Sequence, residues 1–241
     1  MKVIITKDYE ELSKKAAEIM AEQINSNKES VLGLATGGSP VGMYKEIIKM
    51  NKAGKVDFSE IKTINLDEYV GLSGEHPQSY RYFMNENLFN HINIDKNNTS
   101  IQNGLAEDFE EEEKRYDAKI EELGGTDFQV LGVGSNGHIA FNEPNNELVF
   151  GTHLTDLTEE TIRANARFFD SIDEVPTKAF TMGLGGIMQA EKILVIASGE
   201  EKAEAVRGMI KGNISTMMPV SMLQMHRNVT VVVDEAAAKL L

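Results

Sequence analysis

The sequence predicts an α/β fold in which an open, mostly parallel sheet carries helices on both faces. Short runs rich in Val, Ile and Leu alternate with longer segments whose apolar residues recur every three or four positions. Most of the short runs are largely apolar, which is typical of parallel strands covered on both sides. The longer segments then supply the crossover helices. No internal repeat, linker or shift of composition interrupts the chain, so we expect a single domain over residues 1–241.

The expected elements follow one another along the chain. The strands cover residues 3–6, 31–37, 61–69, 128–134, 178–183, 192–199 and 229–235. The first helix has an apolar face made of Leu12, Ala16, Ile19, Met20 and Ile24. The later helices cover residues 41–50, 78–92, 107–123, 157–169 and 200–211. The acidic run 110–113 is expected to form the solvated outer face of its helix.

Composition narrows the class of protein and of partner. A net charge of −14 and a pI near 4.8 argue against nucleic acid and anionic membranes as partners. The chain has no signal-peptide pattern at its start and no apolar run of the roughly 18 residues that a membrane span needs. We therefore expect a soluble, cytoplasmic protein.

No metal or cofactor is expected. The chain lacks Cys, which excludes disulfides, thiol nucleophiles and thiolate metal ligands. Four of its histidines show no paired ligand spacing, namely His76, His91, His153 and His226.

In open α/β sheets, ligands bind beyond the carboxyl ends of the strands, so the residues that follow each strand are the candidates. The first exit, Ala35–Gly42, contains Gly37 and Gly38, which allow a sharp turn, and Ser39, which suits a helix N-cap. A glycine turn that leads into a helix is a site for an anion. The alternative is an ordinary capped turn.

The second exit places two carboxylates side by side. Asp67 and Glu68 end an apolar strand, and adjacent side chains on a strand point to opposite faces. Only one of the two can face a given ligand. That one is a candidate general base, while the alternative for either residue is a loop-capping role.

The third exit is the stretch Gly132–Pro144, which has three glycines in its first six residues, followed by His138 and Glu143. Such a loop can wrap closely round a small ligand, His138 can exchange protons near neutral pH, and Glu143 can orient its ring. A structural histidine is the alternative.

The fourth exit offers positive charge. Lys202 follows Gly199 and is expected in the first turn of a helix, where a cation is unfavourable unless an anion is bound. Arg167 is a second candidate cation, or else a partner in a surface salt bridge. Together the four exits predict a site that moves protons on a phosphorylated sugar without a cofactor.

The motifs at these exits resemble those of the glucosamine-6-phosphate deaminase (isomerase) family. They are "LATGGSPVGMY", "NLDEYVGL" with "HPQSY", "GVGSNGHIAFNEP", "LTEETIRANARFF" and "GEEKAEAV", in family order from about residue 32 to 206. The resemblance implies a modified Rossmann-like fold. It also implies conversion of glucosamine 6-phosphate and water into fructose 6-phosphate and ammonia, as in amino sugar catabolism.

The resemblance also implies roles for individual residues. Asp67 corresponds to the base that moves the C2 proton to C1, and His138 and Glu143 correspond to the pair that handles protons during ring opening. The phosphate is expected at Gly37, Gly38, Ser39, Arg167 and Lys202. Many members have Asp where this chain has Asn136, which is uncharged but can hold the His138 ring through a hydrogen bond.

Two other readings stay open. A 6-phosphogluconolactonase shares the fold and a sugar phosphate, but it needs no base at C2. A sugar-phosphate sensor of a transcription regulator would need a DNA-binding region, for which the acidic chain has no spare segment.

The resemblance bears on regulation too. Allosteric members bind the phosphate of N-acetylglucosamine 6-phosphate at a subunit interface, through basic residues just after "NEP". Here that segment, 145–162, contains no Lys and no Arg and carries several carboxylates. We therefore expect hyperbolic kinetics and a monomer or low-order homo-oligomer.

Overall fold

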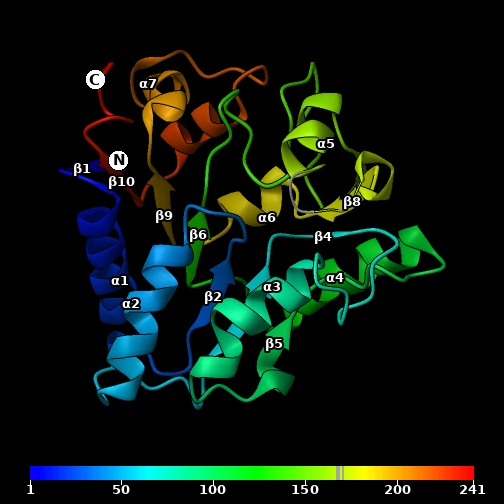
Figure 1. The fold of residues 1–241 in the computed structure, drawn as a ribbon, viewed down its shortest axis with the longest axis horizontal. Coiled ribbons are helices and arrows are strands. Elements are labelled where there is room, and N and C mark those ends of the chain that lie inside the picture. The colour runs from blue at the N-terminus through cyan, green and yellow to red at the C-terminus, as the bar shows by residue number, and fades with distance from the viewer. Residues whose placement is uncertain (167–168, 170) are drawn as a thin grey trace.

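The protein is built on a seven-stranded parallel sheet, seen in a computed structural model that describes residues 1–166, 169 and 171–241. Its strand order is β1-β10-β9-β6-β2-β3-β5, and every neighbouring pair is parallel. The predicted open, mostly parallel sheet is confirmed (Figure 1). The strands are β1 (Lys2–Thr6), β2 (Val31–Leu34), β3 (Lys62–Asn65), β5 (Thr99–Ser100), β6 (Phe128–Leu131), β9 (Lys192–Ala197) and β10 (Val229–Asp234).

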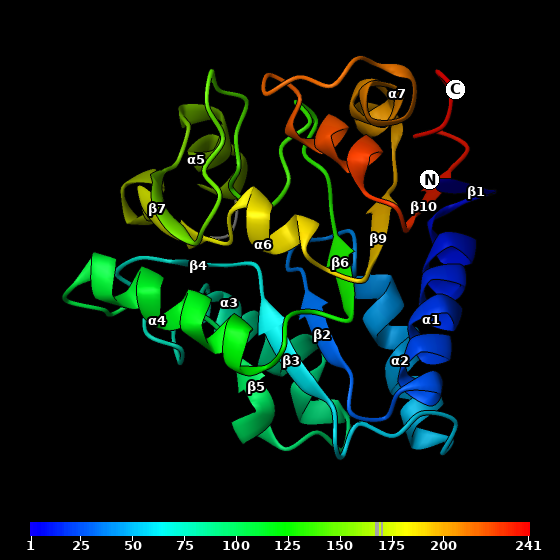
Figure 2. The ribbon, with the colours of Figure 1, turned by 180° about the vertical axis from the view of Figure 1, so that it is seen from behind.

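Helices cover both faces of this sheet, as predicted. On one face α2 and α3 lie towards the viewer in Figure 1, with α1 packed beside α2, and α4 lies on the opposite face, towards the viewer in Figure 2. The α-helices are α1 (Tyr9–Ser26), α2 (Val41–Lys52), α3 (Tyr80–Asn87), α4 (Phe109–Glu122), α5 (Glu159–Asn165), α6 (Leu184–Met188) and α7 (Ala203–Lys211). The apolar face predicted for the first helix packs into the core, where Leu12, Ala16, Met20 and Ile24 are buried and Ile19 is partly buried.

The strand predicted over 61–69 is wrong in one respect, because the chain changes sheet at Leu66. The residues before it form β3, and those after it form β4 (Asp67–Tyr69) in a separate three-stranded antiparallel sheet, order β4-β8-β7. The backbone of Leu66 holds the crossing point: its N–H donates to Leu34 O, and its carbonyl accepts from Met182 N. The exit of β3 therefore faces a second layer, and the single sheet that was predicted is incomplete.

The second sheet contains a strand that the sequence pattern does not reveal. β8 (Lys178–Thr181) was predicted, whereas β7 (His153–Asp156) is half-polar and only partly buried. The two-residue β5 was also not predicted. A strand without an apolar run gives no sequence signal, because its place is set by pairing rather than by burial.

Three helix predictions need correction. The helix predicted over 78–92 ends as α3 at Asn87, since Leu88 leaves the helical region with φ −146°. The helix predicted from 200 begins at Ala203 after a 3₁₀ turn, so Lys202 is its N-cap residue. The predicted helix over 157–169 is α5 as far as Asn165, and its end includes residues outside the described ones.

The acidic run on α4 is not simply a solvated face. Glu112 is buried, accepts from the N–H of Asn103 and pairs with Arg115. Glu113 accepts from the N–H of Leu154 in β7. These carboxylates satisfy backbone donors of neighbouring segments, which a pattern of charges along one helix does not show.

Candidate active site

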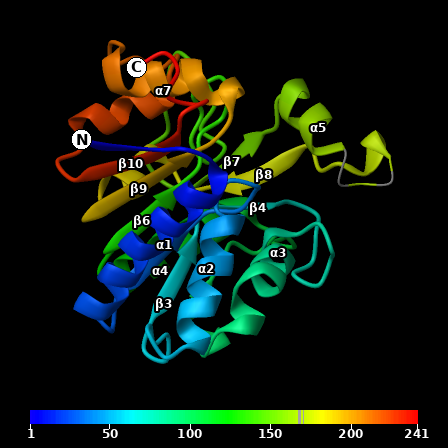
Figure 3. The same cartoon turned by 60° about the vertical axis from the view of Figure 1, so that its left-hand side comes forward.

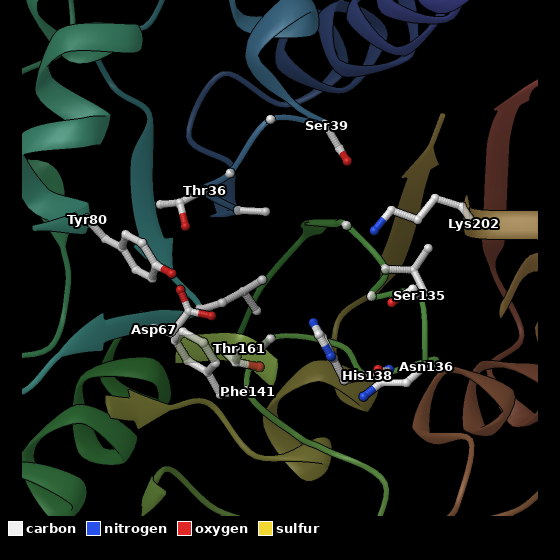
Figure 4. A pocket seen from close by; sticks show the side chains of 18 residues that line it. Thr36, Ser39, Asp67, Tyr80, Ser135, Asn136, His138, Phe141, Thr161 and Lys202 are labelled. Carbon is white, nitrogen blue, oxygen red and sulfur yellow. Dashed lines mark hydrogen bonds between the residues drawn. The ribbon is translucent and has the colours of Figure 1, made fainter. Parts of the chain in front are cut away.

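A cavity of about 310 Å³ opens at the carboxyl ends of β2, β3 and β6. Figure 4 shows Asp67 and Tyr80 on one side, His138 and Asn136 opposite them, and Ser39 and Lys202 at the remaining side. The loops predicted as ligand sites thus converge, although they lie far apart in the sequence. The lining residues are Ala35, Thr36, Gly37, Gly38, Ser39, Leu66, Asp67, Tyr80, Gly132, Val133, Gly134, Ser135, Asn136, His138, Ala140, Phe141, Thr161 and Lys202.

The glycine turn after β2 presents backbone donors to the cavity. Gly37 has φ +86°, a conformation that favours glycine. Within the described residues, the N–H groups of Gly37, Gly38 and Ser39 donate to no protein acceptor. The turn leads into α2, whose dipole is positive at this end. Unpaired N–H groups at a helix start form a site for a small anion.

Asp67 and Glu68 divide their roles as alternation along a strand requires. Asp67 lines the cavity, whereas Glu68 points away and accepts from the N–H groups of Tyr69, Tyr80 and Arg81. Glu68 therefore fixes the start of α3 and with it the position of Tyr80. Glu68 is thus the carboxylate with the capping role.

The environment of Asp67 disfavours its charge. The residue is 7% exposed, and its carboxyl accepts no hydrogen bond from the described part of the chain. Burial, together with the charge of Glu68, raises the pKa of Asp67 to about 8. Burial also raises the pKa of Glu68 to about 7, although its three backbone donors oppose this. A carboxylate of raised pKa is a stronger base than an ordinary one.

His138 is backed by Glu143, and Glu143 does not itself line the cavity. His138 Nδ1 lies 3.3 Å from Glu143 Oε2, but the direction of approach does not make a formed hydrogen bond. The contact is close enough for an ion pair when the ring is protonated. Glu143 therefore adjoins the cavity only through the His138 side chain.

Asn136 holds Glu143 rather than the imidazole ring, which corrects the expected hydrogen bond to the ring. Its Nδ2 donates to Glu143 Oε2 at 2.8 Å, and its Oδ1 accepts from the N–H of His138 at 3.1 Å. Thr161 Oγ1 donates to the other oxygen, Oε1, at 3.0 Å. Burial alone would raise the pKa of Glu143, but His138, Asn136 and Thr161 together lower it.

Glycines let this loop close tightly around the histidine. A Cβ on Gly134 would lie 2.3 Å from the His138 ring, and one on Gly137 would lie 2.0 Å from Met218 Sδ. Gly137 also has φ +87°. The glycines predicted to bring backbone against a ligand thus serve in part to seat the His138 side chain.

Lys202 lines the cavity from the start of α7, where Figure 4 shows its amine directed inward. The turn that carries it is anchored by Asp234, which accepts from the Ser198 hydroxyl and from the N–H of Gly199. Arg167, the other predicted cation, lies outside the described residues.

The sequence patterns do not predict several residues of the site. Thr161 and Tyr80 line the cavity from helices, and Asp234 supports it from β10. The motifs "QSYRYF" and "LTEETI" contain the first two, but residue type alone does not distinguish them from their neighbours. No group of three or more His, Asp or Glu side chains in the described residues is arranged to hold a metal.

Known proteins resemble this chain over its whole length. The model of the family "Glucosamine-6-phosphate isomerases/6-phosphogluconolactonase" matches residues 7–232. A glucosamine-6-phosphate deaminase of Clostridium perfringens is 68% identical over 241 residues, covering all of both chains. One of Thermoanaerobacter sp. is 57% identical, covering all of this chain and 95% of the relative.

Solved structures give the same picture. A monomeric glucosamine-6-phosphate deaminase superposes with a TM-score of 0.97 at 48% identity and covers all of both chains. The 6-phosphogluconolactonase from Trypanosoma cruzi superposes with a TM-score of 0.78 at 17% identity, covering all of this chain and 96% of the other. The second likeness bears on the fold alone.

Proposed function

Because the chain belongs to the family of glucosamine-6-phosphate isomerases and 6-phosphogluconolactonases, we propose that it is a glucosamine-6-phosphate deaminase. It converts glucosamine 6-phosphate and water into fructose 6-phosphate and ammonia. Relatives with up to 68% sequence identity are named as glucosamine-6-phosphate deaminases. The observation that carries the proposal is Asp67, a buried carboxylate that faces His138 across one cavity. The reaction needs a base at C2, and this carboxylate is placed to supply it.

The phosphate group binds at the glycine turn. The unpaired N–H groups of Gly37, Gly38 and Ser39 are suited to bind an anion, and the Lys202 amine enters the cavity beside them. Arg167 is proposed as a further cation on the resemblance alone. Binding at this end leaves the sugar ring between Asp67 and His138.

Ring opening falls to His138 and Glu143. The imidazole takes the proton of the anomeric hydroxyl and returns one to the ring oxygen, which breaks the bond between C1 and that oxygen. Glu143, held by Asn136 and Thr161, stabilises the imidazolium that forms on the way. The product is an open-chain aldehyde.

Proton transfer between carbons falls to Asp67. The aldehyde acidifies the C2 proton, and Asp67 removes it while the C1 oxygen takes up a proton from solvent, which gives an enolamine. Asp67 returns the proton at C1, which leaves an imine at C2. Water adds to the imine carbon, and the C–N bond breaks to release ammonia and fructose 6-phosphate. A positioned base of this kind contributes about 10²–10⁴-fold to the rate.

The test is release of ammonia and fructose 6-phosphate from glucosamine 6-phosphate, each measured in a coupled assay. We expect equal amounts of both products from the wild-type protein. Hydrolysis of 6-phosphogluconolactone without ammonia release from the amino sugar would instead assign the chain to the lactonases. The fold is common to both enzymes, so it does not decide between them.

Three further features belong to the proposal. A monomer or low-order oligomer is supported by the monomeric structure that matches at 48% identity. A single domain is supported by one main hydrophobic core that draws on residues from Leu12 to Ala237. No helix of the described residues is long and apolar enough to cross a membrane. A cytoplasmic location stays a prediction. The absence of a cofactor and the absence of nucleic-acid or membrane partners also stay predictions.

A further inference from the structure

The glycine turn is held from outside the cavity by a residue of α1. The Tyr9 hydroxyl lies 2.9 Å from Gly38 O and 3.1 Å from Ser39 O, and it accepts from the N–H of Gly42 at 2.8 Å. Tyr9 does not line the cavity. One hydroxyl thus joins the turn to the first residues of α2.

This hydroxyl supplies a cap that α2 lacks. The N-cap residue of α2 is Pro40, which makes no side-chain hydrogen bond to the helix. The first N–H groups of a helix have no partner within it, and the Tyr9 oxygen takes one of them. Tyr9 in turn begins α1 directly after Asp8, whose carboxylate caps that helix by accepting from the N–H of Glu11.

Close packing of α1 on α2 brings the hydroxyl within reach. The two helices run side by side in Figures 1 and 3. A Cβ on Gly42 would lie 2.0 Å from Ser13 Oγ and 3.0 Å from the Tyr9 oxygen. Only glycine at position 42 allows this approach, so the contact depends on residues of both helices.

The bond sets the direction of a donor in the phosphate site. In a trans peptide the C=O of one residue and the N–H of the next point in opposite directions. Because the Gly38 carbonyl points to Tyr9, the N–H of Ser39 is turned away from α1, towards the side on which the turn lines the cavity. If the peptide rotated, it would present a carbonyl to the substrate phosphate instead of an N–H.

We propose that Tyr9 is a positioning residue for phosphate binding, which acts by fixing the orientation of the Gly38–Ser39 peptide. The inference rests on the proposed site for the substrate phosphate. A role confined to capping α2 would change the stability of the protein and leave its affinity for phosphate unaltered, so the two roles can be told apart.

The test compares Tyr9→Phe with the wild type and with Tyr82→Phe. The control loses a hydroxyl that makes no hydrogen bond to the described residues. Two constants are measured: the KM for glucosamine 6-phosphate, and the Kd of inorganic phosphate from its protection against thermal unfolding. We expect Tyr9→Phe to raise both by about 3- to 10-fold, with kcat within twofold of wild type.

The outcomes separate this proposal from the proposed function. A Tyr9→Phe protein that melts at a lower temperature, but whose phosphate Kd and KM match the control, would overturn the role of Tyr9. A wild-type protein that releases no ammonia would overturn the deaminase activity, while the phosphate Kd values would still decide on Tyr9.

Discussion

The two carboxylates that serve the cavity sit in opposite environments. Asp67 is buried beside a second carboxylate and accepts no hydrogen bond from the described residues, and its pKa is raised to about 8. Glu143 is partly buried and receives hydrogen bonds from Asn136 and Thr161 beside His138, and its pKa is lowered. The same functional group thus meets two opposite environments, one in the cavity wall and one behind His138.

The difference in pKa supports the tasks proposed for the two residues. A group that must take up and return a proton works best when its pKa lies near the working pH, which suits Asp67. A group that must stay ionised to stabilise an imidazolium works best when its pKa is low, which suits Glu143. Environments that shift the pKa values of two titratable groups in opposite directions are a general guide to acid–base roles.

The largest expected effect comes from removing the buried carboxylate. Asp67→Asn should lower kcat by about 10³-fold or more, because the variant has no base at C2. The phosphate site is untouched, so the Kd of inorganic phosphate should stay within twofold of wild type. Asp173→Asn, the same change at an exposed position, is the control and should behave as wild type.

Two partial reactions sharpen this test. In deuterated water, Asp67→Asn should stop exchange of the C2 proton, while interconversion of the two anomers of bound glucosamine 6-phosphate continues. Both are measured by NMR. Exchange at C2 that persists in the variant would mean that another group is the base.

Glu143→Gln should give the complementary result, with a smaller loss. We expect kcat to fall by about 10²-fold, because the imidazolium of His138 loses its anionic partner while the base at C2 remains. Anomer interconversion should slow by a similar factor. If anomer interconversion kept its wild-type rate in Glu143→Gln, the division of labour between the two carboxylates would be wrong.

The pH dependence should follow Asp67. Only the ionised form is a base, so kcat/KM should fall about tenfold for each pH unit below a midpoint near 8. The substrate amine also titrates, so the carboxyl of Asp67 should be followed directly in the free protein. Carbon-13 NMR of labelled Asp, compared with Asp67→Asn, provides that measurement; a midpoint near the ordinary value of about 4 would contradict the expectation.

Stability should show the same titration with a defined sign. Because the pKa of Asp67 is raised on folding, its contribution to the free energy of unfolding is full below about pH 4 and is lost as pH rises through about 8. Asp67→Asn should therefore lose less stability than wild type between pH 5 and pH 8. Glu143 has a lowered pKa, so its contribution is lost only as the pH falls below the ordinary range for Glu.

The sequence predicts the residues that line the site better than it predicts the partners that set their pKa values. Strand exits with Gly, Asp and His are visible as motifs, and alternation correctly separates Asp67 from Glu68. The partners that set the pKa values are not visible: Thr161 comes from α5, and the burial of Asp67 follows from a change of sheet at Leu66, which the strand pattern over 61–69 does not reveal. Local pattern predicts elements, whereas contacts between distant segments depend on how those elements pack.

The fold shows the same limit. The parallel sheet follows from apolar runs and crossover helices, but β7 has no apolar run and is held by carboxylates of α4. Glu113 accepts from the N–H of Leu154, and Asp117 accepts from the N–H of Thr152. Such side-chain-to-backbone bonds depend on two elements meeting, so the acidic run on α4 alone suggests only a solvated face.

The smallest expected effect concerns regulation of the site through Glu143 and the residues that contact it. The segment 145–162 follows Glu143 and returns to it through the hydrogen bond of Thr161, so an effector bound there could reach this carboxylate. The segment has no Lys and no Arg, and its backbone donors at Thr152 and Leu154 are already taken by α4 carboxylates. A phosphate would meet like charge and find no cation there. We therefore expect hyperbolic substrate curves that change less than twofold on adding N-acetylglucosamine 6-phosphate, since a site that binds nothing couples to nothing. Initial rates measured with and without N-acetylglucosamine 6-phosphate test this expectation. A sigmoidal substrate curve that becomes hyperbolic when the compound is added would show that the enzyme is regulated by it.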